Sequence, residues 1–264
     1  MSGDFVRPLH ALKLGALINL YFLVDTVFLA PRTADPTLVW TAQVLFAVSA
    51  YRCLFPVRYK DYIVLHDSLF SSIFLTRLLA TFAEIAFIFQ FSTLLRRLNT
   101  PGIEWIDWLA WAMMFQVVLS QLFVWWAILS QRLVFYFYEE IGWFLMFLAN
   151  TVASGWLRLT GDLPDAAIGL LNLNLLFGAF YLPWQVLHLR SLRQDAGLDR
   201  GPGVHRPEIS AASLAQGLRD AIYRRQVQRD SAAWGGWIGL VWMVGYWATL
   251  IPLWAHHVAT ATLP

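Results

Sequence analysis

Two adjacent glutamates, Glu139 and Glu140, lie early in a long apolar stretch and are the residues best suited to chemistry in this chain. Neighbouring side chains in an α-helix point about 100° apart, so the two carboxylates cannot both face one small pocket. A carboxyl group buried without a cation keeps its proton and can act as a general acid at neutral pH. We therefore expect one glutamate to neutralise Arg77 and the other to give or take a proton. The alternative is purely structural, with one glutamate paired to Arg77 and Glu139 reaching the cytoplasmic face.

Arg77 and Glu84 form a second candidate pair of catalytic residues. They are seven residues apart, so they share a helix face but are separated by about 10 Å along the axis. This separation predicts no direct contact, and each then needs a partner on another helix. Three amides, Asn150, Asn172 and Asn174, are expected at the depth of Glu84. These amides could form hydrogen bonds with a protonated Glu84, with the polar head of a ligand, or with each other between helices.

Further polar side chains complete the predicted substrate-binding set, because ionisable groups inside lipid need a partner, water or a function. Asp25 is expected near the midplane, and Trp143 can line an apolar pocket or pack in the core. Several others are expected in the cytoplasmic half of the membrane, where we infer a polar cavity that opens to the cytoplasm. The whole set is Asp25, His66, Asp67, Gln121, Trp143, Asn150, Asn172, Asn174, Gln185 and His188.

The sequence offers little support for a hydrolytic triad, a metal or a cofactor. Ser68, Ser71 and Ser72 are expected to cap span three, directly after His66 and Asp67. Helix capping by Asp67 or Ser68 explains this grouping without catalysis. No histidines have the i, i+3 or i, i+4 spacing of metal ligands, so we expect no metal site. The single cysteine, Cys53, excludes an intrachain disulfide and a CxxC redox pair. We also see no dinucleotide or phosphate-binding motif, and expect no cofactor.

Seven apolar stretches of membrane-spanning length must position these side chains. The 264 residues are 58% hydrophobic and 14% charged, whereas a soluble domain carries roughly a quarter charged residues. Each stretch is long enough to cross a hydrocarbon core of about 30 Å as a helix. We predict an all-α integral membrane protein, a seven-transmembrane-helix bundle that forms one domain over residues 1–264. The predicted spans are residues 14–30, 37–55, 69–94, 105–129, 133–157, 166–188 and 234–257.

Lys and Arg are distributed unequally between the two sides of this bundle. The side that holds the N-terminus carries fourteen of them, and the other side carries four. Positive residues stay on the cytoplasmic side, so the N-terminus is predicted to be cytoplasmic and the C-terminus outside. This rule fits a bacterial inner membrane and a eukaryotic endomembrane equally. A cleaved signal is the alternative for the first span, but that span lacks a small-x-small cleavage pattern.

The segment 190–233 is predicted to be a cytoplasmic loop with an irregular first half. Ser213 to Gln216 has the pattern of a capping box that opens a short helix. Apolar residues from Leu214 to Val227 roughly follow one face of this helix, and arginines occupy the others. We predict a basic amphipathic helix that lies on the anionic inner leaflet, between spans six and seven.

Membrane lipids and a lipophilic small molecule are the partners that these features predict. The net charge of +2 is too small to indicate nucleic acid. Gly235 and Gly239 have the spacing of a close-packing face, which predicts a neighbouring helix there. The only lysines, Lys13 and Lys60, lie outside the last span, so no retinal Schiff base can form in it.

In size, span count and sparse buried carboxylates the chain is similar to small seven-span terpene cyclases. This likeness is architectural, and no catalytic residue is carried over from it. We expect an integral membrane enzyme that isomerises or cyclises a lipophilic, isoprenoid- or lipid-like substrate, with a glutamate as general acid or base. The alternative is a non-enzymatic carrier, sensor or accessory subunit of a membrane complex.

Overall fold

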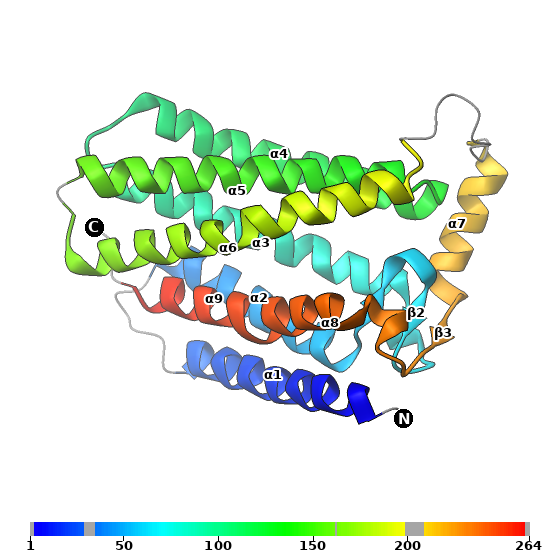
Figure 1. The fold of residues 1–264 in the computed structure, drawn as a ribbon. Helices are drawn as coiled ribbons and strands as arrows, with labels where there is room; N and C mark the ends of the chain where they lie inside the picture. Colours follow the sequence, from blue (N-terminus) through cyan, green and yellow to red (C-terminus); the bar gives the residue numbers. More distant parts are fainter. Residues whose placement is uncertain (1–2, 29–34, 162, 199–208, 262–264) are drawn as a thin grey trace. The chain divides into compact units, whose positions relative to one another are not determined.

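The computed structural model describes residues 3–28, 35–161, 163–198 and 209–261, and these are mostly helical (Figure 1). Six of the described helices are long and apolar enough to cross a membrane. They are α1 (Gly3–Phe28), α2 (Pro36–Leu54), α3 (Ile73–Leu98), α4 (Glu104–Ser130), α6 (Asp165–Asp195) and the continuous run of α8 (Gly236–Val244), η4 (Gly245–Leu250) and α9 (Ile251–Thr260). The architecture is therefore that of an all-α, multi-pass membrane protein.

The helix α5 (Val134–Thr160) coincides with the predicted fifth span but is not among these six helices. It has 27 residues, which is ample length to cross a membrane. Its composition differs, because Glu139, Glu140 and Asn150 lower its mean hydropathy. Each of the seven predicted spans thus overlaps a helix, and all of these helices except α5 are both long and apolar enough to cross a membrane.

The described residues form two compact units, which we describe separately. Unit 1 contains the chain up to Phe87 and the segment from Leu218 to Ala261, and unit 2 runs from Ile88 to Gly217. The helices α3 and α7 (Ala211–Tyr223) contribute to both units. The prediction of a single transmembrane domain concerns how the two units join, and stays a prediction.

In unit 1, α1 and α2 pack together and the run from α8 to α9 packs against both. The ring of Phe5, at the start of α1, lies 5.9 Å from the ring of Trp234, just before α8. Near the other end of α1, Asp25 contacts His256 of α9. The helices α1 and α8–α9 therefore run in the same direction.

The π-helical segment η4 is joined to α1 by a side-chain amide. Asn19 Nδ2 donates to the Gly15 carbonyl oxygen at 2.8 Å and to the Trp247 carbonyl oxygen at 3.0 Å. A π-helix disturbs the regular backbone ladder, and a side chain can then reach its carbonyl groups. Gly15 permits this close approach, because a Cβ atom there would lie 2.2 Å from the Cβ of Ala248.

A small three-stranded sheet, which the sequence did not predict, closes one end of unit 1 (Figure 1). It consists of β1 (Val57–Arg58), β2 (Ile63–Val64) and β3 (Gln226–Val227), with β2 antiparallel to β1 and parallel to β3. Between β1 and β2 the chain forms η1 (Tyr59–Asp61) and then turns at Tyr62, whose φ of 56° is left-handed. Strands of two residues are too short to show the alternation from which a sheet is predicted.

Two helices begin at other residues than the sequence indicated. The prediction that span three starts at residue 69 is wrong, because Leu69–Ser71 is the separate 3-10 turn η2. The helix α3 starts at Ile73, and Ser72 Oγ accepts from the backbone N–H of Leu75 at 3.2 Å. Of the serines expected to cap span three, Ser72 is therefore the one whose side chain caps α3.

The predicted capping box of α7 is also wrong by one turn. The helix begins at Ala211, and the two serines on either side of this start bind each other. The Ser213 backbone N–H donates to Ser210 Oγ at 3.2 Å. The Ser210 backbone N–H donates to Ser213 Oγ at 2.9 Å. This is capping-box geometry with serine at both positions. In unit 2 the first half of α7 packs on α4 through Gly217, where a Cβ atom would lie 2.0 Å from the Leu129 carbonyl oxygen.

The segment between α6 and α8 is shorter than the predicted loop of residues 190–233. The helix α6 continues to Asp195, so Arg190 and Arg193 lie on that helix. The segment also includes β3 and the turn η3 (Ala232–Trp234), while the predicted irregular stretch at 199–208 lies outside the described residues. The residues between the first two predicted spans, 31–36, likewise lie outside them, apart from Asp35 and Pro36.

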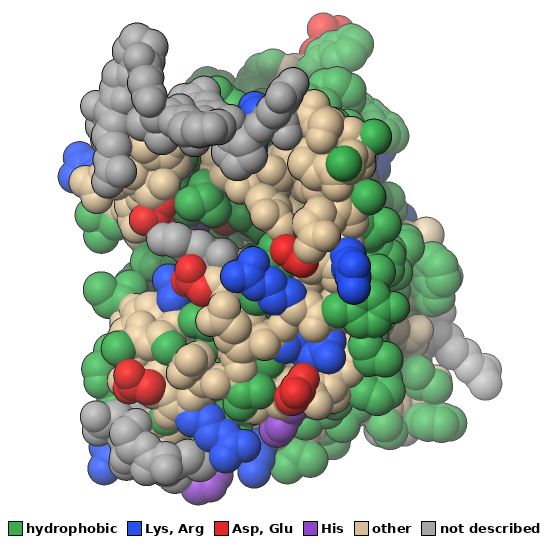
Figure 2. Space-filling model, turned by 90° about the vertical axis from the view of Figure 1, so that its right-hand side faces the viewer, with side chains coloured by type: hydrophobic (Ala, Val, Ile, Leu, Met, Phe, Trp, Pro, Cys, Tyr) green, Lys and Arg blue, Asp and Glu red, His purple; other side chains and the backbone are tan. Residues whose placement is uncertain are grey.

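Basic and acidic side chains share the face of the molecule shown in Figure 2. Around the sheet of unit 1 several of them are paired. Arg225 Nε lies 2.8 Å from Asp67 Oδ1, and Arg58 Nη1 lies 3.3 Å from Asp61 Oδ2. The arginines at this end of unit 1 are thus partly neutralised within the chain.

Candidate functional site

Glu140 lies at the centre of a polar cluster that joins α5 to α6 in unit 2. Gln185 Nε2 donates to Glu140 Oε2 at 2.6 Å and to the Glu140 backbone carbonyl oxygen at 2.9 Å. His188 Nε2 lies 3.6 Å from Glu140 Oε1. Gln185 is fully buried, whereas the Glu140 and His188 side chains are 23% and 32% exposed. A buried amide therefore fixes a carboxylate that meets an imidazole, and the carboxylate and the imidazole are open to a second molecule.

The two adjacent glutamates face different neighbours, as the helical geometry predicts. Glu139 is buried and shares its face of α5 with Gly142, three residues later. A Cβ atom at Gly142 would lie 2.3 Å from Gln116 Nε2 and 2.4 Å from Ser120 Oγ, so this face packs closely on α4. Glu140 instead contacts α6. The prediction that one of them neutralises Arg77 stays a prediction.

A row of rings along α6 leads to His188, and sequence reasoning missed it. Phe177, Tyr181, Trp184 and His188 recur at the spacing of one helix face. Their successive centroids are 5.4, 6.0 and 4.8 Å apart, and the Trp184 and His188 rings are stacked at 18°. Phe147 of α5 packs on the row, 4.8 Å from Phe177 and 4.5 Å from Tyr181. Trp143, a predicted site residue, is buried and stacks on Phe147.

Arg77 and Glu84 form a buried ion pair in unit 1, which corrects the prediction that they are too far apart. Arg77 Nη2 donates directly to Glu84 Oε2, and the two side chains are 3% and 11% exposed. The predicted separation of about 10 Å holds for the backbone. A long guanidinium side chain and a glutamate reaching toward each other bridge that distance along one helix face.

The buried amides of unit 2 bind to each other. Asn174 Nδ2 donates to Ser154 Oγ at 3.0 Å and to Asn150 Oδ1 at 3.4 Å, and all three residues are fully buried. These contacts join α5 to α6, which is the interhelical role that the sequence left open. Asn172 lies on the exposed side of α6 and takes no part in this cluster.

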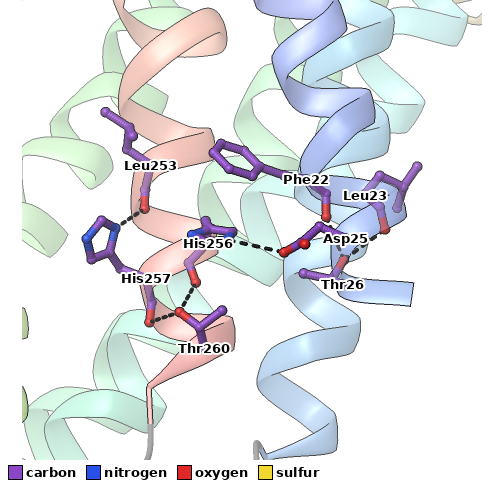
Figure 3. Close-up of polar contacts among 8 residues, drawn as sticks. All are labelled: Phe22, Leu23, Asp25, Thr26, Leu253, His256, His257 and Thr260. Carbon is purple, nitrogen blue, oxygen red and sulfur yellow. Dashed lines mark hydrogen bonds and ion pairs between the residues drawn. The ribbon is translucent and has the colours of Figure 1, made fainter. Parts of the chain in front are cut away.

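Asp25 lies three residues before Phe28, the last described residue of α1 (Figure 3). The prediction that it reaches the midplane of the membrane stays a prediction. His256 Nε2 of α9 lies 3.4 Å from Asp25 Oδ2, and the ring of Phe22 stacks on the imidazole with centroids 4.3 Å apart. The sequence could have indicated this pair, because Asp25 and His256 lie near the C-terminal ends of predicted spans one and seven, and both ends are predicted on the same side of the membrane.

The remaining predicted residues, His66, Asp67 and Gln121, lie on other elements. His66 and Asp67 are exposed in the segment between β2 and α3, where Asp67 pairs with Arg225 and the His66 ring meets Phe55 edge-on. Gln121 is buried on α4. Within the described part of the chain, no three His, Cys, Asp or Glu side chains are close enough to hold a metal ion.

A surface groove of about 420 Å³ lies between α1 and α8 in unit 1. Its lining is mostly apolar, and none of the predicted site residues belongs to it. The inferred polar cavity that opens to the cytoplasm stays a prediction.

Comparison with protein-family models, with curated proteins and with solved structures found no match for this chain. The function must therefore be argued from the chemistry of these clusters.

Proposed function

We propose that the protein is an integral membrane enzyme that isomerises or cyclises a lipophilic, isoprenoid- or lipid-like molecule at Glu140 and His188. The observation that carries this proposal is the cluster of Glu140, Gln185 and His188. It combines a carboxylate and an accessible imidazole, the pair that general acid–base catalysis at neutral pH uses most often. The likeness to terpene cyclases belongs to this proposal and rests on architecture alone.

In the proposed reaction, the His188 imidazolium gives its proton to one carbon of a double bond of the substrate, which leaves a carbocation. The neutral imidazole then removes a proton from a carbon next to the cationic carbon, so the double bond moves or a ring closes, and the reaction needs no oxidant or reductant. The Glu140 carboxylate stabilises the imidazolium before the first step and after the second. The stacked ring of Trp184 and the aromatic row beyond it offer an apolar wall that favours positive charge on the substrate.

Gln185 has a positioning role, because it is fully buried and its Nε2 fixes the carboxylate of Glu140. Arg77 and Glu84 neutralise each other and are assigned a structural role in this proposal.

The direction of the helices in unit 1 supports seven spans. Because α1 and α8–α9 run in the same direction, the chain must cross the membrane an odd number of times between them. The helices α2, α3, α4 and α6 give four crossings, and α5 supplies the fifth. With the excess of Lys and Arg on the N-terminal side, this gives a cytoplasmic N-terminus and an outside C-terminus, in a bacterial inner membrane or a eukaryotic endomembrane.

Single cysteines on the two sides of α5 test this topology. In a Cys53→Ser background, Leu133→Cys and Asp165→Cys should react with a membrane-impermeant maleimide from opposite sides of sealed vesicles. Labelling of both from the same side would show that α5 does not cross the membrane.

The enzymatic proposal is tested by incubating purified protein with a total lipid extract and analysing the lipids by chromatography and mass spectrometry. An isomerase or cyclase converts one lipid into a product of the same mass and a different retention time. Glu140→Gln and His188→Gln should each reduce this conversion by at least about 100-fold. Glu104→Gln is the matched control, because Glu104 is exposed on α4. Full conversion by both site variants would refute the proposal.

A second candidate, a proton-coupled carrier, is favoured by one further observation. Asp25 and His256 form another partly exposed carboxylate–imidazole pair, near the end of α1 that is farther from the N-terminus. A second pair of groups able to exchange protons is what such a carrier requires. Uptake into vesicles that depends on a proton gradient and is lost in Asp25→Asn, without any isobaric product, would select the carrier over the enzyme.

A further inference from the structure

The groove between α1 and α8 combines an apolar floor with a cationic end. Arg7, Pro8 and Ala11 line it from α1, and apolar residues between Trp237 and Val244, followed by Gly245, line it from α8 and the start of η4. Its volume of about 420 Å³ lies within the range typical of small-molecule sites. All of these residues belong to unit 1.

The exposed face of α1 shows where the groove lies with respect to a membrane. Its exposed residues are Arg7, His10 and Lys13 in the first part, and from Leu14 to Phe28 they are apolar. This change marks the boundary between the headgroups and the hydrocarbon core. Arg7 lies about 10 Å on the headgroup side of Leu14, and Trp237 is 51% exposed at the same end of the groove. Tryptophan at such a boundary is typical of membrane proteins.

From its cationic end the groove extends toward the hydrocarbon core. Trp237 and Gly245 are eight residues apart, which corresponds to about 12 Å along α8. Because α8 runs parallel to α1, Gly245 is deeper in the membrane than Trp237. Gly245 also opens the π-helical segment η4, and such segments often mark functional sites.

We propose that this groove binds one anionic phospholipid from the leaflet on the N-terminal side, with its phosphate at Arg7 and the upper part of one acyl chain between α1 and α8. Arginine presents a planar set of donors that matches a phosphate group. The apolar floor removes the chain from contact with neighbouring lipids and fixes its position. This site is independent of the proposed chemistry at Glu140, which lies in the other unit.

Two kinds of variant test the contact with the lipid phosphate and the contact with the acyl chain separately. Arg7→Gln removes the charge, and Lys13→Gln is its matched control, because Lys13 is exposed on the same helix but does not line the groove. Gly245→Leu fills the groove. A Cβ atom at Gly245 meets nothing within 4 Å, and the backbone there is right-handed helical, so leucine is tolerated.

The experiment is native mass spectrometry of full-length protein titrated with phosphatidylglycerol or phosphatidylcholine of equal chain length. The wild-type protein should retain one phosphatidylglycerol in preference to phosphatidylcholine. Arg7→Gln should lose about fivefold in this preference, the factor that corresponds to about 1 kcal/mol for one basic residue at an anionic surface. Lys13→Gln should keep the preference, and Gly245→Leu should retain neither lipid.

Two results would overturn the proposal. Equal losses in Arg7→Gln and Lys13→Gln would show general attraction to the basic end of α1, and full retention by Gly245→Leu would show that the chain lies elsewhere. A thermal melt of each variant shows that it is folded. Failure of this site leaves the lipid-conversion assay for Glu140 and His188 unaffected.

Discussion

Breaking the Arg77–Glu84 pair should be among the most destabilising single changes in unit 1. The two side chains are 3% and 11% exposed, so solvent screens their attraction little. Unit charges 4 Å apart at an effective dielectric constant near 20 attract by about 4 kcal/mol. Removal of one partner also leaves the other charge buried, and measured costs for such changes are about 3–5 kcal/mol. We expect this loss in Glu84→Gln and in Arg77→Met.

The assay is thermal unfolding of purified protein in one detergent, followed by a spectroscopic probe of helix content. For a chain of this size a loss of 3–5 kcal/mol lowers Tm by roughly 6–20 °C. The double variant Arg77→Met/Glu84→Gln closes a double-mutant cycle. Because the two groups contact each other directly, the double variant should be less destabilised than the sum of the single ones by about 2–3 kcal/mol.

An exposed pair provides the matched control. Arg224 Nη1 lies 3.6 Å from Asp220 Oδ2, but the Arg224 side chain is 50% exposed. Ion pairs of this kind contribute about 0–1 kcal/mol, so Arg224→Gln should change Tm by only a few degrees. The reasoning is refuted if the Arg77 and Glu84 losses add within about 0.5 kcal/mol, or if neither single variant unfolds earlier than Arg224→Gln.

Three further predictions concern helix packing. Gly217→Ala places a Cβ atom against a backbone carbonyl oxygen and should lower stability by about 1–3 kcal/mol, measured as faster trypsin cleavage within α7. Gly169→Ala is the control, because its Cβ atom meets nothing within 4 Å, and it should leave the cleavage rate unchanged. Asn174→Leu should destabilise by about 1–2 kcal/mol in detergent melts, whereas Asn172→Leu, on the exposed side of the same helix, should not lower Tm. Ser210→Ala should weaken the start of α7 by about 1 kcal/mol, measured as faster amide exchange in its first turn.

Hydropathy predicted the helices well, because a chain that crosses lipid must satisfy its backbone groups within each span. All seven predicted stretches overlap helices of the structure, including α5 with its two glutamates. The sheet of β1, β2 and β3 was missed, since it forms from three short segments, one of which is far away in the chain. Periodicity within a local window cannot report such pairing.

The candidate site was predicted in composition but not in its contacts. Sequence reasoning placed Glu140, Gln185 and His188 at similar depth together with six other polar residues, and the structure brings these three together. It separated Arg77 from Glu84, because backbone rise alone was considered and not the length of both side chains.

The polar clusters described above fall into two kinds. Arg77–Glu84, within α3, and the cluster of Asn150, Ser154 and Asn174, between α5 and α6, are closed to solvent. The pair of Glu140 with His188 is 23% and 32% exposed, and that of Asp25 with His256 is 20% and 28% exposed on the carboxylate and imidazole sides. Each imidazole is also stacked on an aromatic ring.

Accessibility therefore separates the residues that stabilise the fold from those able to exchange protons with a ligand. If this division is correct, variants of the closed pairs lower Tm and leave lipid conversion or proton-coupled uptake intact in the protein that remains folded. Variants of the open pairs lose lipid conversion or proton-coupled uptake but keep the Tm of the wild-type protein, because a partly exposed pair contributes little stability. A variant of Glu140 or His188 that unfolds the protein, but retains full function while folded, would place that pair with the structural ones.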